Sequence, residues 1–186
     1  PLSFAQEQVW FLHQLNDSNV SYHVPRVIRI QGKLDIGLVE RTFNEIMRRH
    51  EILRTTFPTI NGEPVQRIME HRPFKLSFID LSELAGYFQS QRVTQWLNQE
   101  GQRPFDFEKG PMIRITLLKL KPEEHLLVNT EHHLIHDGWP QGVLLREFIA
   151  IFTPFSQRHA SPLPELPIQY RDFVYWQREY MQGEVL

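Results

Sequence analysis

Helix-like and strand-like patterns follow one another along this chain in an irregular order, and this irregularity is the strongest constraint on its fold. The clearest helix pattern covers residues 36–50 behind a capping Asp35, with apolar side chains at intervals of three and four. Strand patterns cover residues 22–30, 112–120 and 126–131. The strict strand–helix alternation that is typical of parallel sheets does not occur in the sequence. We therefore expect an α+β fold.

Turn and cap signals set the expected boundaries of several elements. Ser3 and Gln6 have the spacing of a helix-capping box, and Pro25 would remove one ladder hydrogen bond, which suggests an edge strand. Asn61-Gly62 is a dipeptide typical of hairpin turns. Three prolines make residues 161–167 an extended connector. The remaining expected elements are helices at 2–15, 82–99, 138–155 and 168–183 and hairpin strands at 53–57 and 65–69.

Aromatic residues in the first and last expected helices have a spacing that is typical of packed faces. Residues 10–12 (WFL) belong to the first helix, and Tyr170, Phe173 and Trp176 recur at intervals of three residues in the last one. We expect both groups to be part of the core rather than a recognition surface.

The overall composition restricts the classes of function. The chain has 186 residues and a formal net charge of −2, so it offers no electrostatic reason to expect a nucleic-acid partner. No apolar run approaches the roughly 20 residues that span a bilayer, so no membrane association is expected. The absence of cysteine excludes disulfides and thiol chemistry and is compatible with a cytoplasmic location. Because the sequence begins at Pro1 rather than at methionine, we interpret it as a segment of a longer protein.

The segment 131–139 (EHHLIHDGW) is the most informative one for chemistry. It lies between an apolar strand pattern and an apolar helix pattern, where rigid elements on both sides can hold side chains in a pocket. Neighbouring strand residues point to opposite faces, so only one of His132 and His133 can line a given cavity. A neutral imidazole there can accept a proton or orient an amine near neutral pH. Gly138 permits a tight turn, and Asp137 can form an ion pair with a buried arginine.

Other interpretations of the same residues stand beside the catalytic one. Paired histidines beside a strand are more often packing or surface groups than catalytic ones. A metal site formed by His132, His133 and His136 is disfavoured, because adjacent strand residues diverge and the sequence has no HExxH pattern and no cysteine. A serine triad is disfavoured because no GxSxG pattern occurs.

Four motifs, in this order, give the chain a clear resemblance to a known family. Residues 132–138 (HHLIHDG) match the HHxxxDG signature of the condensation domains of nonribosomal peptide synthetases and of the wider chloramphenicol-acetyltransferase-like superfamily. Residues 3–12 (SFAQEQVWFL) resemble the opening SxAQxRLWxL motif, with Gln8 in place of the usual arginine. Residues 49–57 (RHEILRTTF) match RHExLRTxF, and residues 170–176 (YRDFVYW) resemble YxDFAxW. The resemblance covers essentially the whole chain.

The resemblance implies a fold and a reaction for the whole domain. It implies the chloramphenicol-acetyltransferase-like two-layer sandwich with a mixed or antiparallel sheet, and residues 1–186 would form its amino-terminal lobe without the carboxy-terminal lobe. In the family, donor and acceptor carrier proteins bring substrates on phosphopantetheine arms to a channel between two lobes, where the acceptor amine attacks the donor thioester. The implied partners are both carrier proteins, the second lobe and an adjacent adenylation domain. No cofactor or metal is expected to bind the chain directly.

The resemblance also implies roles for individual residues. His133 would be the catalytic group in the channel, where it orients the acceptor amine or removes its proton. Gly138 would leave room near the reacting carbonyl, with its backbone N–H as an oxyanion donor. Asp137 would pair with Arg54, or with Arg49 as the alternative. The residues expected to support the site are His132, Asp137, Arg54 and Arg49.

Related functions are separated by smaller differences in sequence. An epimerisation domain of the same superfamily also carries an HHxxxDG loop, but the opening motif here resembles that of condensation members. A heterocyclisation domain is disfavoured because its loop has aspartate in place of both histidines. The loop end at residues 137–139 (DGW) resembles the subtype that joins an L-configured donor to an L-configured acceptor. A non-catalytic docking or scaffold module is the other alternative, and we expect the isolated lobe to be inactive.

Overall fold

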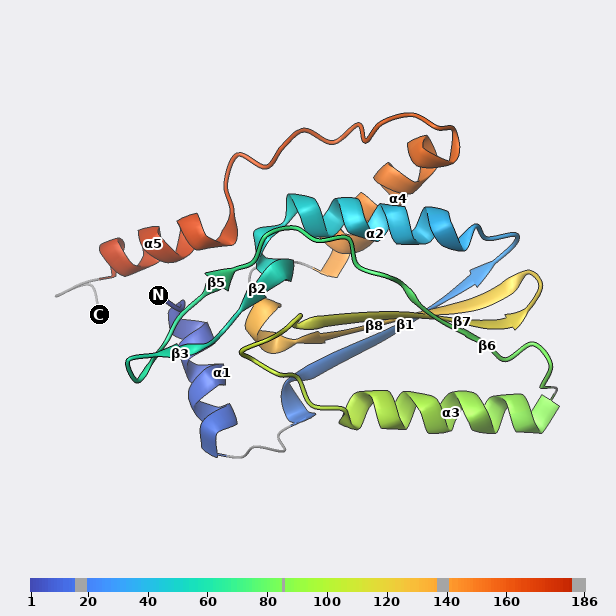
Figure 1. Cartoon of the computed structure of the whole chain (residues 1–186), viewed down its shortest axis with the longest axis horizontal. Helices are drawn as coiled ribbons and strands as arrows, with labels where there is room; N and C mark the ends of the chain where they lie inside the picture. Colours follow the sequence, from blue (N-terminus) through green and yellow to red (C-terminus); the bar gives the residue numbers. More distant parts are fainter. Residues whose placement is uncertain (16–19, 85, 137–140, 182–186) are drawn as a thin grey trace.

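A mixed sheet of four strands forms the centre of the computed structural model (Figure 1). The structure describes residues 1–15, 20–84, 86–136 and 141–181. In sheet order the strands are β1 (His23–Gln31), β8 (Glu124–His132), β7 (Ile113–Lys121) and β6 (Ser77–Asp80). β8 is antiparallel to both of its neighbours, whereas β6 is parallel to β7. The edge position of β1 confirms the expectation from Pro25, which cannot donate a ladder hydrogen bond.

Helices cover both faces of this sheet. They are α2 (Ile36–Arg49), α4 (Gln141–Ser156) and α3 (Gly86–Gln102). α2 and α4 lie on one face, and α3 lies on the other (Figure 1). Leu117 of β7 belongs to the larger core under α2 and α4, while the next residue, Leu118, packs in a smaller core with Trp96 of α3. Successive strand side chains point to opposite faces, so β7 is buried on both sides. The structure confirms the α+β class and the mixed sheet covered by helices.

The helix caps expected from the sequence are present. At the start of α2, Oδ1 of Asp35 accepts a hydrogen bond from the N–H of Leu38 at 3.1 Å. α1 (Phe4–Leu15) begins behind Ser3, whose N–H donates to Oε1 of Gln6 at 2.9 Å. The Gln6 N–H donates in return to Oγ of Ser3 at 3.1 Å. These reciprocal bonds satisfy backbone donors that a helix start leaves unpaired.

The Asn61-Gly62 dipeptide forms the expected hairpin turn. Its two residues have positive φ angles of 54° and 85°, which asparagine and glycine adopt more readily than other residues. The turn joins β3 (Thr59–Ile60) to β4 (Glu63–Pro64), and the hairpin continues where β2 (Thr55–Thr56) pairs with β5 (Arg67–Ile68). Each arm of the hairpin is therefore divided into two short strands.

The last helix packs against the beginning of the chain. After the proline-rich connector, residues 161–167, which forms no helix or strand, α5 (Tyr170–Tyr180) lies at the same end of the molecule as α1 (Figure 1). The hydroxyl of Tyr170 donates to Oγ of Ser3 at 2.9 Å, and Nε of Arg178 donates to the carbonyl oxygen of Leu2 at 2.9 Å. These bonds bring the first and the last sequence motif together.

The expectation that both aromatic groups lie in the core is wrong for most of their side chains. Phe11 is 59% exposed and Leu12 is 42% exposed on α1, and Phe173 and Trp176 are 40% and 55% exposed on α5. The spacing of three does place Phe173 and Trp176 on one face of α5, where their rings contact each other. The described part of the chain does not cover these faces, so helical spacing alone did not determine burial.

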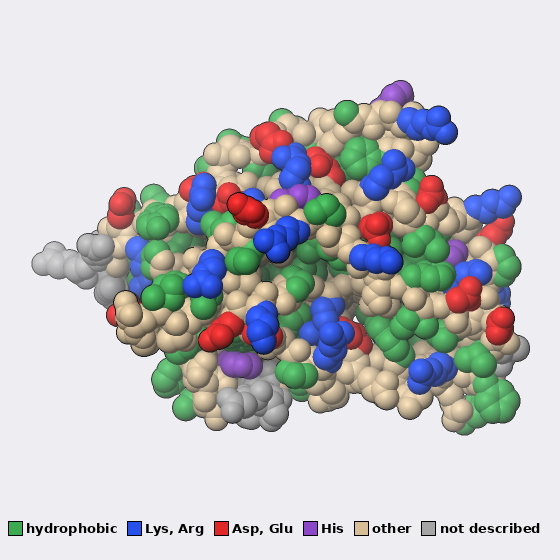
Figure 2. Space-filling view, viewed as in Figure 1, with side chains coloured by type: hydrophobic (Ala, Val, Ile, Leu, Met, Phe, Trp, Pro, Cys, Tyr) green, Lys and Arg blue, Asp and Glu red, His purple; other side chains and the backbone are tan. Residues whose placement is uncertain are grey.

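Charges of both signs are interspersed on the face shown in Figure 2. This distribution agrees with the small formal net charge of −2. Within the described ranges, none of the helices combines the length and the apolar character needed to cross a bilayer.

Candidate active site

The two adjacent histidines of the HHxxxDG loop lie where a strand ends. β8 ends at His132, and a short 3₁₀ turn, η3 (His133–Ile135), follows directly. His132 is 1% exposed, whereas His133 is half-buried. Asp137 and Gly138 lie outside the described residues, so their expected roles stay predictions. The change from strand to turn therefore gives the two neighbouring imidazoles different surroundings.

His132 is enclosed by aromatic rings. The ring centroids that lie 4.8–6.3 Å from the His132 centroid belong to His13, Tyr22, His23, Phe105 and Phe107. Nδ1 of His132 accepts a hydrogen bond from the N–H of Leu134 at 3.2 Å. Because Nδ1 is the acceptor, the neutral ring carries its proton on Nε2. This bond holds the ring against the turn that follows it.

The surroundings of His132 keep its imidazole uncharged. Burial, with smaller contributions from nearby histidines and from Arg114, lowers the pKa of His132 to about 3. Burial disfavours the charged form because the interior solvates an imidazolium poorly. The structure thus places His132 in the interior, as expected, where it packs and accepts a hydrogen bond.

His133 occupies the more accessible position of the pair. Its ring centroid lies 6.4 Å from that of Tyr22 at an interplanar angle of 84°, and 5.6 Å from that of His136 at 71°. These edge-on contacts are a favourable geometry for aromatic rings. Nδ1 of His133 is buried and has no hydrogen-bond partner among the described residues. An imidazole held in this way on a turn can meet a substrate.

Gln6 supports this turn from the first helix. Its side chain is 1% exposed, and its Nε2 donates to the carbonyl oxygen of Leu134 at 2.9 Å. The capping box that Gln6 forms with Ser3 is thereby joined to the turn that carries His133. The sequence signals the cap through its Ser-x-x-Gln spacing. No local pattern signals the bond to Leu134, because 128 residues separate the two partners.

A buried polar network lies next to His133. Glu131 is 4% exposed, and it accepts a hydrogen bond from Nδ2 of Asn129 at 2.6 Å. The other carboxylate oxygen of Glu131 lies 3.0 Å from Nδ1 of His136. The guanidinium of Arg26 lies 3.3 Å from Nε2 of His136 and 4.0 Å from the Glu131 carboxylate. A buried carboxylate needs such partners because burial disfavours an isolated charge.

This network was not expected from the sequence. The sequence suggests His136 only as a metal ligand, and the described residues contain no group of three side chains that could hold a metal ion. His136 instead faces Glu131. Arg26 comes from β1, which pairs with β8 although 110 residues separate Arg26 from His136. Only the strand register brings these groups together.

Arg49 joins two helices and the connector. It is 3% exposed, and its Nε lies 3.2 Å from Oε2 of Glu147 on α4. It also donates to the carbonyl oxygen of Leu163 at 3.2 Å, and Nε2 of His50 lies 2.8 Å from Oε2 of Glu147. Burial by itself raises the pKa of Glu147, but hydrogen bonds from His50 and Arg49 outweigh it and lower the pKa to about 2. A pairing of Arg49 with Asp137 would involve a residue outside the described ranges and stays a prediction.

Arg54 has described partners of its own. One guanidinium nitrogen donates to the carbonyl oxygen of Met69, and another lies 3.7 Å from Oε1 of Glu51. Its Nε is buried and has no hydrogen-bond partner within the described residues. The expected ion pair with Asp137 also falls outside the described ranges and stays a prediction.

Comparison with solved structures identifies the class of fold. The X-domain from teicoplanin biosynthesis has a TM-score of 0.87 and 27% sequence identity, covering 99% of this chain and 39% of that one. The starter condensation domain of rhizomide synthetase has a TM-score of 0.86 at 18% identity, covering 98% of this chain and 44% of that one. The protein therefore has the chloramphenicol-acetyltransferase-like fold of condensation domains.

Sequence comparison then identifies the family. The family model described as "Condensation domain" matches residues 1–186. Malpinin synthetase from Mortierella alpina is 38% identical over 100% of this chain and 2% of its own length. Phosphinothricin tripeptide synthetase PhsC from Streptomyces viridochromogenes is 38% identical over 100% of this chain and 18% of its own length. The chain belongs to the condensation domain family of nonribosomal peptide synthetases, whose general function is peptide bond formation. It spans only a small part of these curated relatives.

Proposed function

We propose that this chain is the amino-terminal lobe of a condensation domain that joins a carrier-bound donor thioester to a carrier-bound acceptor aminoacyl thioester. The acceptor amine attacks the carbonyl carbon of the donor thioester. A C–N bond forms and the C–S bond breaks. The proton that the amine loses ends on the sulfur of the donor arm, which leaves as a thiol. Thioester and amine thus become amide and thiol.

The contrast between the two histidines carries this proposal. His132 is buried and uncharged, whereas His133 is half-buried on a turn with edge contacts from Tyr22 and His136. Since Nδ1 of His133 is buried, Nε2 is the nitrogen that orients the acceptor amine or removes its proton. A thioester is already activated, and precise positioning of two reactants can lower a barrier by about 7–11 kcal/mol.

The partners follow from the same proposal. Two carrier proteins deliver the substrates on phosphopantetheine arms, the second lobe closes the channel, and an adenylation domain lies nearby in the synthetase. The small share that this chain covers of its relatives, 2% of malpinin synthetase, supports a place within a much longer protein. The oxyanion role of Gly138, the preference for an L-configured donor and acceptor, and the cytoplasmic location belong to this proposal as well.

The test is a substitution of His133 in the condensation domain that contains this chain. With two loaded carrier proteins, we expect His133→Ala to lower the rate of dipeptidyl-thioester formation by about 10²–10⁴-fold, the usual contribution of a general base. The matched control is His159→Ala, because His159 is exposed in the segment after α4. Mass spectrometry of the carrier-bound product measures the rate. Unchanged amide formation by His133→Ala would remove this residue from the mechanism.

A non-catalytic docking module is the second candidate, and one observation favours it. The solved X-domain that is 27% identical to this chain also appears in a complex with OxyB, so this fold can serve as a binding partner. A docking module would form no amide with any loaded carrier pair. An epimerisation domain would instead exchange the α-hydrogen of a single carrier-bound residue with deuterated solvent. The same preparation can be tested for all three outcomes.

A further inference from the structure

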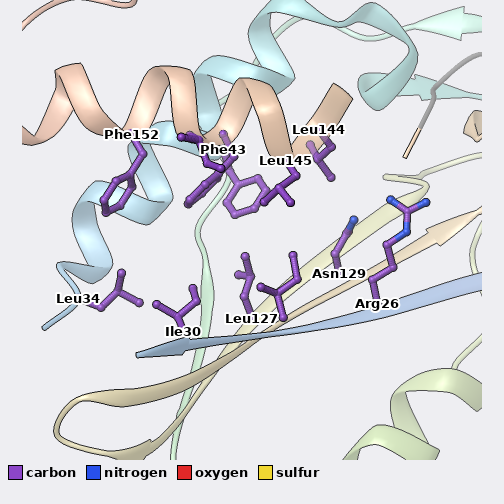
Figure 3. A pocket seen from close by; sticks show the side chains of 12 residues that line it. Arg26, Ile30, Leu34, Phe43, Leu127, Asn129, Leu144, Leu145 and Phe152 are labelled. Carbon is purple, nitrogen blue, oxygen red and sulfur yellow. The ribbon is translucent and has the colours of Figure 1, made fainter. Parts of the chain in front are cut away.

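An apolar pocket of about 320 Å³ lies between α4 and the edge of the sheet (Figure 3). Its floor is formed by side chains of β1 and β8, including Ile28 and Leu127, and its roof by leucine, isoleucine and phenylalanine side chains of α4, including Leu145 and Phe148. The volume lies within the range of small-molecule sites, roughly 300–1,000 Å³. The pocket is therefore large enough to hold an apolar side chain.

The pocket has a single polar end. Arg26 and Asn129 lie together at one end, and Leu34 and Phe152 lie at the other (Figure 3). Nδ2 of Asn129 donates to Glu131, while Oδ1 of Asn129 is buried and has no hydrogen-bond partner among the described residues. A buried acceptor without a partner is costly and is well suited to an N–H group of a ligand.

The polar end also connects the pocket to the catalytic turn. Arg26 lines the pocket, and its guanidinium lies 3.3 Å from Nε2 of His136. The ring of His136 in turn contacts the ring of His133 at a centroid distance of 5.6 Å. A group bound in the pocket would thus have its polar end on the side of His133.

The mouth of the pocket exposes apolar side chains. Ile28 is 37% exposed, Leu145 is 45% exposed and Ile149 is 57% exposed, and all three line the pocket. Covering this surface with another apolar group removes it from water, which is favourable. The apolar walls, the open mouth and the polar end near His133 together describe a site for an amphipathic group.

We propose that this pocket binds the apolar side chain of a carrier-bound aminoacyl thioester, with an N–H group of that residue at Oδ1 of Asn129. This inference rests on the proposed function, because it names the substrate class of the same site. It predicts that the domain prefers residues with large apolar side chains over alanine. An apolar side chain beside an N–H group occurs in both the donor and the acceptor residue, and the experiment below tells which of the two binds here.

The test is a substitution on β1 that narrows the pocket, made in the condensation domain that contains this chain. Ile28→Trp fills the mouth, while Val27→Trp is the matched control, since Val27 is 46% exposed on the opposite face of the same strand. Alanine, leucine and phenylalanine are varied at the donor with a fixed acceptor, and then at the acceptor with a fixed donor. In one of the two series we expect Ile28→Trp to lower kcat/KM for leucine and phenylalanine about tenfold or more relative to alanine, as hydrophobic pockets discriminate.

The outcomes separate this inference from the proposed function. Three results would overturn the pocket assignment. The first is an equal loss of kcat/KM for alanine, leucine and phenylalanine in both series. The others are equal effects of Ile28→Trp and Val27→Trp, or no effect of Ile28→Trp. The first of these results would indicate that another part of the domain covers this surface. If the unchanged domain forms no amide at all, the proposed function itself fails. Leu145→Trp narrows the same mouth from α4, so it provides a second variant if Ile28→Trp does not fold.

Discussion

His132 and His133 are adjacent in the sequence, and their different surroundings determine what each can do. The ring of His132 is packed among other rings, including Phe107 at a centroid distance of 4.8 Å. Its Nδ1 already accepts the N–H of Leu134. The ring of His133 has edge contacts with Tyr22 and His136 and stays half-buried. The first histidine therefore fixes the turn, and the second is the more exposed of the two, which the proposed catalytic role requires.

The low pKa of His132 predicts a loss of stability in mild acid. The pKa is about 3 in the folded chain and 6.5 without the fold, so the unfolded state binds more protons between these values. The free energy of unfolding should therefore fall as the pH decreases from 6.5 towards 3, by up to about 1.4 kcal/mol per pH unit for this group. His132→Asn should remove this contribution and flatten the pH dependence. Urea unfolding at pH 7, 6, 5 and 4 measures it.

A matched substitution tests whether the effect belongs to His132. His159 is exposed, so His159→Asn should leave the pH dependence of the unfolding free energy unchanged. A steeper or equal pH dependence in His132→Asn than in the original chain would contradict the assignment of the buried, uncharged ring.

At the scale of elements, a buried ion pair joins α2 to α4. Arg49 of α2 is 3% exposed, and it contacts Glu147 of α4 and the carbonyl oxygen of Leu163 in the connector. Loss of one partner leaves the other charge buried without compensation. The contact therefore helps to fix α4, which forms the roof of the apolar pocket.

This pair predicts a large loss of stability in Arg49→Ala. We expect the free energy of unfolding to fall by about 3–5 kcal/mol, as is typical when one member of a buried pair is removed. The neighbouring Arg48 is the matched control, because it is 41% exposed and pairs with Glu45 and Glu165 on the surface. Arg48→Ala should cost about 0–1 kcal/mol. Urea unfolding followed by circular dichroism measures both, and equal losses would contradict the buried role of Arg49.

The sequence predicted correctly those caps and turns that depend on residues close together in the chain. The cap at Asp35, the box at Ser3 and the turn at Asn61-Gly62 each depend on residues within a few positions, and all three are confirmed. β6 was not expected, because its four residues are too few for a pattern and its partner strand is distant: Ser77 pairs with Thr116. α3 begins at Gly86, four residues later than expected, with that glycine at its first position rather than in its interior.

The site was predictable in part for the same reason. The motif identified His132 and His133 as a pair, and the pair lies at the end of a strand, as the sequence predicted. The groups that hold the turn could not be found in this way, because they come from distant segments. Gln6 reaches Leu134 from α1, and Arg26 reaches His136 from β1. Residue type and spacing alone do not predict such contacts, because the contacts also depend on the order of the strands in the sheet.

At the scale of the whole molecule, two of the described regions that expose apolar side chains bear on the proposed function. One is the outer side of α1 and α5, where Phe11 and Trp176 are more than half exposed. The other is the mouth of the pocket between β1 and α4, where Ile149 is 57% exposed. Exposed apolar patches of this kind mark surfaces that bind other groups. Solved relatives are longer, since the alignment covers 39% of the teicoplanin X-domain.

We expect the 186-residue chain alone to form no amide when it is mixed with loaded donor and acceptor carriers. Under the proposed function a second lobe holds one of the two substrates, and effective molarities of about 10⁵–10⁸ M are lost when the two substrates are not held together. Circular dichroism should first show that the chain is folded, so that inactivity reports on the site. His133→Ala of the same chain sets the background in a mass-spectrometric assay of the dipeptidyl thioester. Product above that background would show that one lobe holds both reactants by itself.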